Sequence, residues 1–226
     1  EIRGHGTGTV IVPIAHALAA RMGVKLELIG NPTPPVLIEC LKAGNCDVGF
    51  LGVRQPRTKL VDFAPPHIMV PFTYLVPANS PVRTVADADK PGIRIAAVRN
   101  HASTHVLHEV IKHAKMIEVT IPDEAFELVR SGKADAYASP RPPILEYAKQ
   151  LPGSRVLDGS YGENRQSIAL AKGQAARLAY VSAFVEEARA SGVIQKSIQL
   201  AGERGIVVAP GHDAILTGTV PGAAKH

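Results

Sequence analysis

Two arginines follow directly after a short apolar run, in a position where they can bind an anion. Val48 to Val53 are apolar or glycine, and the next residues read Arg54-Gln-Pro-Arg57. A buried strand delivers such residues to its C-terminal end, where open α/β sheets bind ligands. A planar guanidinium donates two parallel hydrogen bonds to a carboxylate. The pattern predicts an anion site, although a strand leading into an ordinary basic loop has the same composition.

A similar arrangement recurs further along the chain. Gly44-Asn-Cys-Asp47 and Gly132-Lys-Ala-Asp135 each follow a helical pattern, and each aspartate opens a short apolar strand. The second strand also runs out into proline and arginine, as Ser139-Pro-Arg141-Pro. A Gly-x-x-Asp turn between helix and strand is common, so the recurrence alone is modest support. If it reflects a repeat, two similar lobes offer their strand ends to a cleft between them, where small-molecule sites form.

Alternating helices and strands must position these residues. Apolar spacing and capping residues predict helices over residues 10–22, 36–43, 100–113, 122–131, 175–190 and 193–201. Short apolar or alternating runs predict strands over residues 25–29, 47–53, 71–77, 93–98, 118–121, 135–138, 155–157 and 167–171. The run Ser-Pro-Arg-Pro-Pro over residues 139–143 follows the strand expected over residues 135–138. This alternation predicts an α/β fold with mostly parallel sheets flanked by helices.

Composition narrows the function classes. The 226 residues carry a net charge of +5, but aromatic residues make up only 4% and tryptophan is absent. Nucleic-acid binding needs a clustered basic stripe or stacking aromatics, and the lysines and arginines here are scattered, so no nucleic-acid partner is expected. No apolar run approaches the roughly 20 residues that span a bilayer. The chain opens on Glu1 without a charged and then apolar leader, as a mature exported protein does.

Cysteines and histidines leave alternatives open. Cys40 and Cys46 flank a glycine turn, and their even number suits a disulfide in an oxidising compartment, while two buried thiols suit the same sequence. His101, His105 and His108 share one face of a predicted helix, as zinc ligands do, but exposed histidines explain that spacing equally. No metal and no cofactor is expected.

One segment of the sequence has a recognisable signature. Arg57-Thr-Lys-Leu-Val-Asp62-Phe63-Ala-Pro-Pro66-His67 resembles the R-x-x-x-v-d-F-s-x-P-Y signature of bacterial extracellular solute-binding proteins of the polar-amino-acid type, the receptors of ABC uptake transporters. The resemblance extends over most of the chain. It implies a two-lobed periplasmic-binding-protein fold of type II with two hinge strands. Carried onto this sequence, lobe one is residues 1–75 plus 170–226 and lobe two is residues 76–169.

The resemblance also implies a ligand-binding set. In amino-acid-binding members the signature arginine, here Arg57, grips the ligand carboxylate, and a helix start in lobe two adds N–H groups and a hydroxyl. The expected ligand-binding residues are Asn31, Phe50, Gly52, Arg54, Arg57, His67, Asn100, His101, Ala102, Ser103, Thr104, Ser139 and Arg141.

Three positions depart from the family pattern. Pro140 stands where amino-acid-binding members place an aspartate for the ligand ammonium, Arg54 stands at a threonine position, and His67 replaces a tyrosine. Losing an acid and gaining cations makes an organic anion a better ligand than an α-ammonium compound.

The resulting hypothesis is a monomeric, periplasmic receptor of an ABC importer, without catalytic residues. It captures a small anionic or amino-acid-like solute by lobe closure and delivers it to a membrane permease. Two alternatives are a lyase or dehydratase that evolved from a binding protein, with Glu163 as a candidate general acid, and a ligand-binding sensor domain.

Overall fold

The chain divides into two compact units in the computed structural model, which describes residues 8–30 and 33–211. Within these residues, the first unit holds the chain up to Met69, Arg165–Glu203 and the residues from Val207 onward, and the second holds Val70–Asn164 and Arg204–Ile206. Two strands, β3 (Ile68–Val76) and β8 (Gly162–Ala171), belong in part to each unit. The boundaries expected after Leu75 and Ala169 lie a few residues later in the chain than those of these units.

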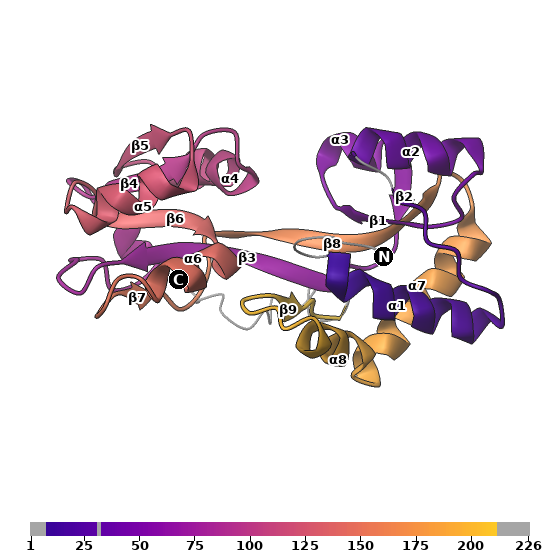
Figure 1. Ribbon diagram of the computed structural model, residues 1–226. Helices are drawn as coiled ribbons and strands as arrows, with labels where there is room; N and C mark the ends of the chain where they lie inside the picture. Colours follow the sequence, from indigo (N-terminus) through magenta and orange to yellow (C-terminus); the bar gives the residue numbers. More distant parts are fainter. Residues whose placement is uncertain (1–7, 31–32, 212–226) are drawn as a thin grey trace. The chain divides into compact units, whose positions relative to one another are not determined.

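The first unit combines antiparallel strands with helices (Figure 1). Its helices are α1 (Gly8–Met22), α2 (Pro34–Ala43), α3 (Gln55–Thr58), α7 (Ala175–Ala190) and α8 (Val193–Leu200). Its own strands are β1 (Gly49–Gly52), β2 (Val61–Phe63) and β9 (Val207–Val208). Both β1 and β2 pair with β8, with Phe50 opposite Ile168 and Asp62 opposite Leu170. This pairing fixes where the residues after β1 emerge.

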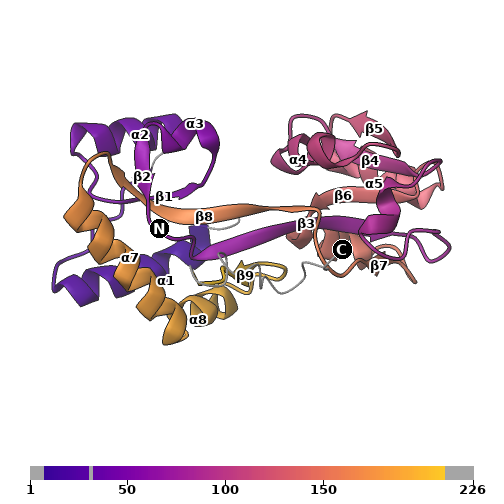
Figure 2. The same cartoon turned by 180° about the vertical axis from the view of Figure 1, so that it is seen from behind.

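Local sequence explains the boundaries of α2. Pro34 and Pro35 occupy its first turn, where a missing N–H costs nothing, and Gly44 ends it with a φ of 75°. The helix buries Ile38 and Leu41 in a cluster with Leu51 of β1. On the other side of the unit, α1 packs against α7 and α8 (Figure 2).

A disulfide joins the end of α2 to the start of the strand region. Cys40 and Cys46 are bonded, with their Cα atoms 5.3 Å apart. This settles the alternative that the sequence left open, because a turn at Gly44 brings the two cysteines within bonding distance.

The second unit is built on a mixed sheet. Its strands, besides parts of β3 and β8, are β4 (Arg94–Val98), β5 (Lys115–Val119), β6 (Ala136–Pro140) and β7 (Arg155–Val156). Its helices are the 3-10 turn η1 (Ala86–Asp89), α4 (Ala102–Val110), α5 (Pro122–Arg130) and α6 (Arg141–Ala148). β4 pairs parallel with β5 and β6, whereas β6 and β7 pair antiparallel with β3.

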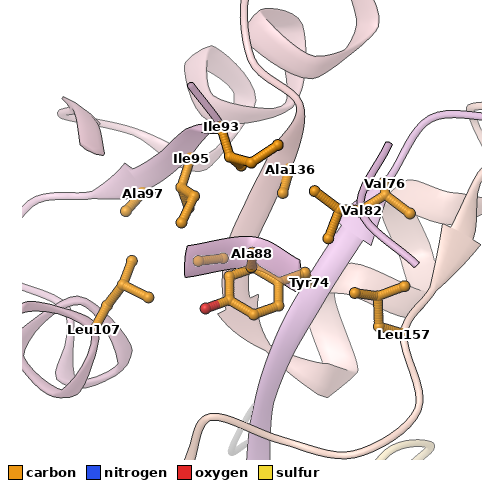
Figure 3. Packing of buried hydrophobic residues seen from close by; sticks show 11 residues of the cluster. Tyr74, Val76, Val82, Ala88, Ile93, Ile95, Ala97, Leu107, Ala136 and Leu157 are labelled. Atoms are coloured by element: carbon orange, nitrogen blue, oxygen red, sulfur yellow. The ribbon is translucent and has the colours of Figure 1, made fainter. Parts of the chain in front are cut away.

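Apolar side chains cover both faces of this sheet. One cluster gathers around Tyr74, Ile95 and Leu107, whose side chains Figure 3 shows with their neighbours. The other gathers around Tyr137, Phe126 and Ile144, beneath α5 and α6. Alternate strand residues point to opposite faces, so neighbouring positions such as Ile95 and Ala96 belong to different clusters.

Two expectations about the elements are corrected. The fold is α/β, but the sheet is mixed and not mostly parallel, because β8 pairs antiparallel with β1 and β2, and β3 pairs antiparallel with β6. Residues 24–30 form no strand, and Leu28 is 41% exposed. An alternating segment needs a strand beside it, and no strand of the described chain pairs with Lys25–Leu28. Residues 139–143, for which no helix was expected, form the end of β6 and the start of α6, since prolines suit a first helical turn.

Among the helices of residues 8–30 and 33–211, none is long and apolar enough to cross a membrane.

Candidate functional site

A single helical turn holds the two arginines of the first unit together. Arg54 is the N-cap residue of α3, and its carbonyl accepts hydrogen bonds from the backbone N–H groups of Arg57 (2.9 Å) and Thr58 (3.2 Å). The turn brings the two residues close enough for the charge of Arg54 to act on that of Arg57. The spacing in the sequence is therefore converted into a pair of neighbouring cations just beyond the C-terminal end of β1.

The guanidinium of Arg57 is half-buried and oriented. Its Nη1 donates a hydrogen bond to the carbonyl oxygen of Gly52, the last residue of β1, over 2.8 Å. Burial is the main cause that lowers the pKa of Arg57, and the positive charge of Arg54 lowers it further. An arginine nevertheless stays protonated in proteins. The remaining N–H donors of Arg57 thus belong to a cation whose position is set before any ligand arrives.

No described carboxylate neutralises this pair of arginines. Asp62 is close in sequence, but its Oδ1 accepts from Lys172 Nζ and its Oδ2 from the N–H of Gly173, each over 2.9 Å. Those bonds lower the pKa of Asp62, with the contact to Lys172 as the largest cause. Among the described residues, neither Arg54 nor Arg57 forms an ion pair.

His67 lies inside the first unit. Its side chain is 0% exposed, and its ring stands edge-on to that of Phe50 with the centroids 5.5 Å apart. Neither Nδ1 nor Nε2 has a hydrogen-bond partner among the described residues. Burial, assisted by the charge of Arg189, lowers the pKa of His67 to about 4. The imidazole is therefore neutral at pH 7 and is not a third cation of the site.

The start of α4 supplies the corresponding group in the second unit. Asn100 has a φ of 64°, a left-handed conformation that asparagine tolerates better than most residues, and His101 is the N-cap. Ala102 begins the helix, and Thr104 donates its hydroxyl hydrogen to the carbonyl of Val98 over 2.6 Å. This bond ties the helix start to the end of β4. No side chain caps the N-terminal N–H groups of α4, which therefore retain their capacity to bind an anion.

Ser103 adds a buried hydroxyl to this helix start. It is 1% exposed, and its Oγ has no partner among the described residues. The phenol oxygen of Tyr161 is equally buried and equally without a partner. Burial is the largest cause of the raised pKa of Tyr161, and Ser103 is close enough to oppose the shift. Two buried hydroxyls thus lie close together beside the N-terminus of α4.

Tyr161 was not among the residues that the sequence indicated. Its ring lies 4.9 Å from that of Tyr74 and 6.0 Å from that of Phe72. The sequence around it contains no motif, and the tyrosine reaches Ser103 only because β8 and α4 meet in the folded unit. Its neighbour Gly162 is pressed against α4, since an added Cβ would lie 2.5 Å from Cγ1 of Val106.

Ser139 and Arg141 occupy the C-terminal end of β6. Parallel pairing of β4 with β6 brings the ends of both strands, and hence the residues that follow them, to the same edge of the sheet. Ser139 is buried, and Arg141 is already engaged, because its Nη1 donates to the carbonyl of Leu157 over 3.1 Å and its Nη2 lies 3.9 Å from Asp158 Oδ1. Arg141 is therefore anchored within its own unit.

The expected site residues thus form two groups. Phe50, Gly52, Arg54, Arg57 and His67 gather around the end of β1 in the first unit. The second unit holds Asn100, His101, Ala102, Ser103, Thr104, Ser139 and Arg141. Asn31 lies outside the described residues.

A metal centre finds no support in the described part of the chain, which contains no group of three or more histidine, cysteine, aspartate or glutamate side chains placed to hold an ion. In the row of histidines on α4, His108 Nε2 instead contacts Glu118 Oε1 over 2.7 Å.

Curated proteins with related sequences include a virulence sensor protein and a glutamine-binding protein. The chain is 34% identical over 134 residues to the virulence sensor protein BvgS of Bordetella bronchiseptica, a match that covers 57% of this chain and 10% of that protein. It is 28% identical over 150 residues to a glutamine-binding protein of Geobacillus stearothermophilus, covering 66% of this chain and 56% of that one. The chain therefore spans little more than half the length of the glutamine-binding protein and about a tenth of the sensor protein.

Solved structures of related proteins share the fold. An ancestral cationic amino acid solute-binding protein has a TM-score of 0.64 and 28% identity, covering 88% of this chain and 87% of that one. An ancestral cyclohexadienyl dehydratase has a TM-score of 0.59 and 27% identity, covering 84% and 81%. These similarities identify the α/β architecture as the type II periplasmic-binding-protein fold.

The sequence signature, the fold and the oriented Arg57 agree with a match that runs over residues 4–199. The chain belongs to the bacterial extracellular solute-binding proteins, family 3.

Proposed function

We propose that this chain is the substrate-binding receptor of an ABC importer, and that it captures a small anionic or amino-acid-like solute by closing its two lobes. In this proposal the protein acts as an exported monomer in the periplasm and delivers its solute to a membrane permease. Family membership and the glutamine-binding relative support this role.

The observation that carries the proposal is Arg57. Its guanidinium is held by Gly52, is half-buried and forms no ion pair within the described chain. A pre-oriented cation without an internal partner has its charge available for a carboxylate from outside. The start of α4, with the buried hydroxyl of Ser103, offers donors to the same kind of group. A solute that contacts both units stabilises the arrangement in which both contacts are made.

Replacing Arg57 by alanine tests the proposal. The variant should bind a carboxylate solute more weakly by about 1.5–3 kcal/mol, the range for a hydrogen bond to a charged group. Isothermal titration calorimetry with glutamine, other amino acids and small carboxylates measures the change. Arg177→Ala is the matched control, because Arg177 is an exposed arginine of the same unit whose ion pair among the described residues is with the exposed Asp47. Equal affinity of wild type and Arg57→Ala for every solute that binds would refute the role of Arg57.

A sensor domain is a second candidate, and the similarity to a virulence sensor protein favours it. Both candidates predict solute binding, so calorimetry does not separate them. A receptor stimulates uptake of its solute when it is added to vesicles that contain its permease. A sensor domain instead changes the signalling output of the protein that contains it, without uptake.

The dehydratase alternative predicts that the bound compound is consumed. Its support is the similarity to an ancestral cyclohexadienyl dehydratase. Mass spectrometry of candidate substrates after incubation with the protein detects this activity, and unchanged compounds favour a receptor.

A further inference from the structure

Arg54 and Arg57 act as a pair because of the local backbone. The carbonyl of Arg54 accepts hydrogen bonds from the N–H groups of Arg57 and Thr58, and these two bonds close a helical turn that holds the two arginines close together. The influence of Arg54 on the pKa of Arg57 reflects this proximity. Two like charges this close repel one another, so a group that neutralises both stabilises the folded unit.

Among its described residues, the first unit supplies no ion-pair partner for either arginine. Besides Asp62, which Lys172 and Gly173 occupy, the paired carboxylates of the unit also face other cations. Asp47 pairs with Arg177, Glu186 with Arg189 and Glu187 with Arg21. The described residues thus leave an excess of positive charge at the end of β1.

A zwitterionic solute compensates the positive charge of the two arginines poorly. One carboxylate compensates one guanidinium, and an ammonium group on the adjacent carbon brings a third positive charge toward the second guanidinium. A second carboxylate in place of the ammonium compensates both arginines. The difference in affinity between a dicarboxylate and an amino acid therefore depends on Arg54 more than on Arg57, because Arg57 binds a carboxylate in both solutes.

We propose that Arg54 is a second anion-binding residue that selects dicarboxylates without an α-ammonium over amino acids. This inference rests on the proposed function, because it assigns the ligand class of the Arg57 site. In this proposal Arg54 determines specificity, and Arg57 binds the carboxylate that every such solute carries.

Calorimetry of Arg54→Gln with malonate, succinate and glutarate as dicarboxylates, and with glutamine and butyrate as comparisons, tests the inference. Wild type should bind at least one dicarboxylate more tightly than glutamine and butyrate. Arg54→Gln should weaken that binding by about 10-fold, as expected for one charge-assisted contact at an exposed side chain, and should change butyrate binding by less than about 2-fold. Lys59→Gln is the control, because it removes one exposed positive charge from the end of the same turn.

Three results would overturn the inference: no dicarboxylate binding by wild type, tighter binding of glutamine, or an equal effect of Arg54→Gln and Lys59→Gln. Each of them leaves the receptor proposal standing as long as some solute binds and Arg57→Ala weakens it. Loss of the Arg57 effect, in contrast, removes the receptor proposal itself.

Discussion

Acidification should destabilise the first unit through His67, and His67→Phe should remove this effect. The imidazole is fully buried, and both of its nitrogens lack a partner among the described residues. Its pKa is about 4 in the folded chain, against 6.5 for an unperturbed histidine. Phenylalanine keeps a ring beside Phe50 and carries no nitrogen to desolvate, so the exchange should not create a cavity.

The sign follows from which state binds the proton. Below pH 6.5 the unfolded chain protonates His67, whereas the folded chain keeps it neutral down to about pH 4. The unfolded state therefore binds more protons in this window, and stability falls as the pH falls. The full difference of about 2.5 between the two pKa values corresponds to about 3 kcal/mol, of which about 2 kcal/mol should be lost between pH 7 and pH 5.

Urea unfolding of wild type and variant at pH 7, 6 and 5 measures this loss. Between pH 7 and pH 5 the free energy of unfolding of the first unit should fall in wild type by about 2 kcal/mol more than in His67→Phe. Comparing the two proteins cancels the pH dependence that comes from the other titrating groups. His105→Gln is the control for loss of an exposed histidine and should follow wild type. Parallel pH curves for wild type and His67→Phe would show that the buried imidazole has a partner or is hydrated.

Two further predictions concern stability. Replacing Cys40 and Cys46 by alanine should lower the free energy of unfolding, measured by urea unfolding, by about 2 kcal/mol, the chain-entropy value for so short a loop. A reducing agent should lower the stability of wild type but not that of the variant. Equal stability of the two proteins without reductant would contradict the effect. Gly162→Ala should destabilise the second unit by about 1–3 kcal/mol, because its Cβ would meet Val106 at 2.5 Å. Adding Val106→Ala should recover stability relative to Gly162→Ala alone, and a simple sum of the two losses would refute the contact as the cause.

Most helices could be predicted from the sequence because their signals are local. The helix expected over residues 10–22 is α1, and α7 covers residues 175–190 as predicted. Gly44 and Gly132 both stop a helix in the left-handed conformation, with φ values of 75° and 73°. Apolar spacing and capping act within a few residues, so no knowledge of the rest of the chain was needed.

Strand partners and burial could not be predicted in this way. The run over residues 25–29 alternates like a strand, but a strand forms only by pairing with another one, and alternation carries no information about that partner. The same reason explains the mixed sheet, since the direction of pairing depends on where β3 and β8 run. Sequence spacing also left the bond between Cys40 and Cys46 undecided, because a disulfide depends on the distance and direction between two side chains.

The residues of the candidate site also differ in how far the sequence could predict them. The sequence by itself placed Arg54 and Arg57 just after the apolar run that forms β1, but no helix was expected over residues 54–58, and the turn α3 that holds the two arginines together appears only in the structure. Only the tertiary structure decided that His67 is buried and neutral and that Tyr161 accompanies Ser103 at the start of α4. Desolvation depends on everything that packs around a group, and those neighbours come from distant parts of the chain.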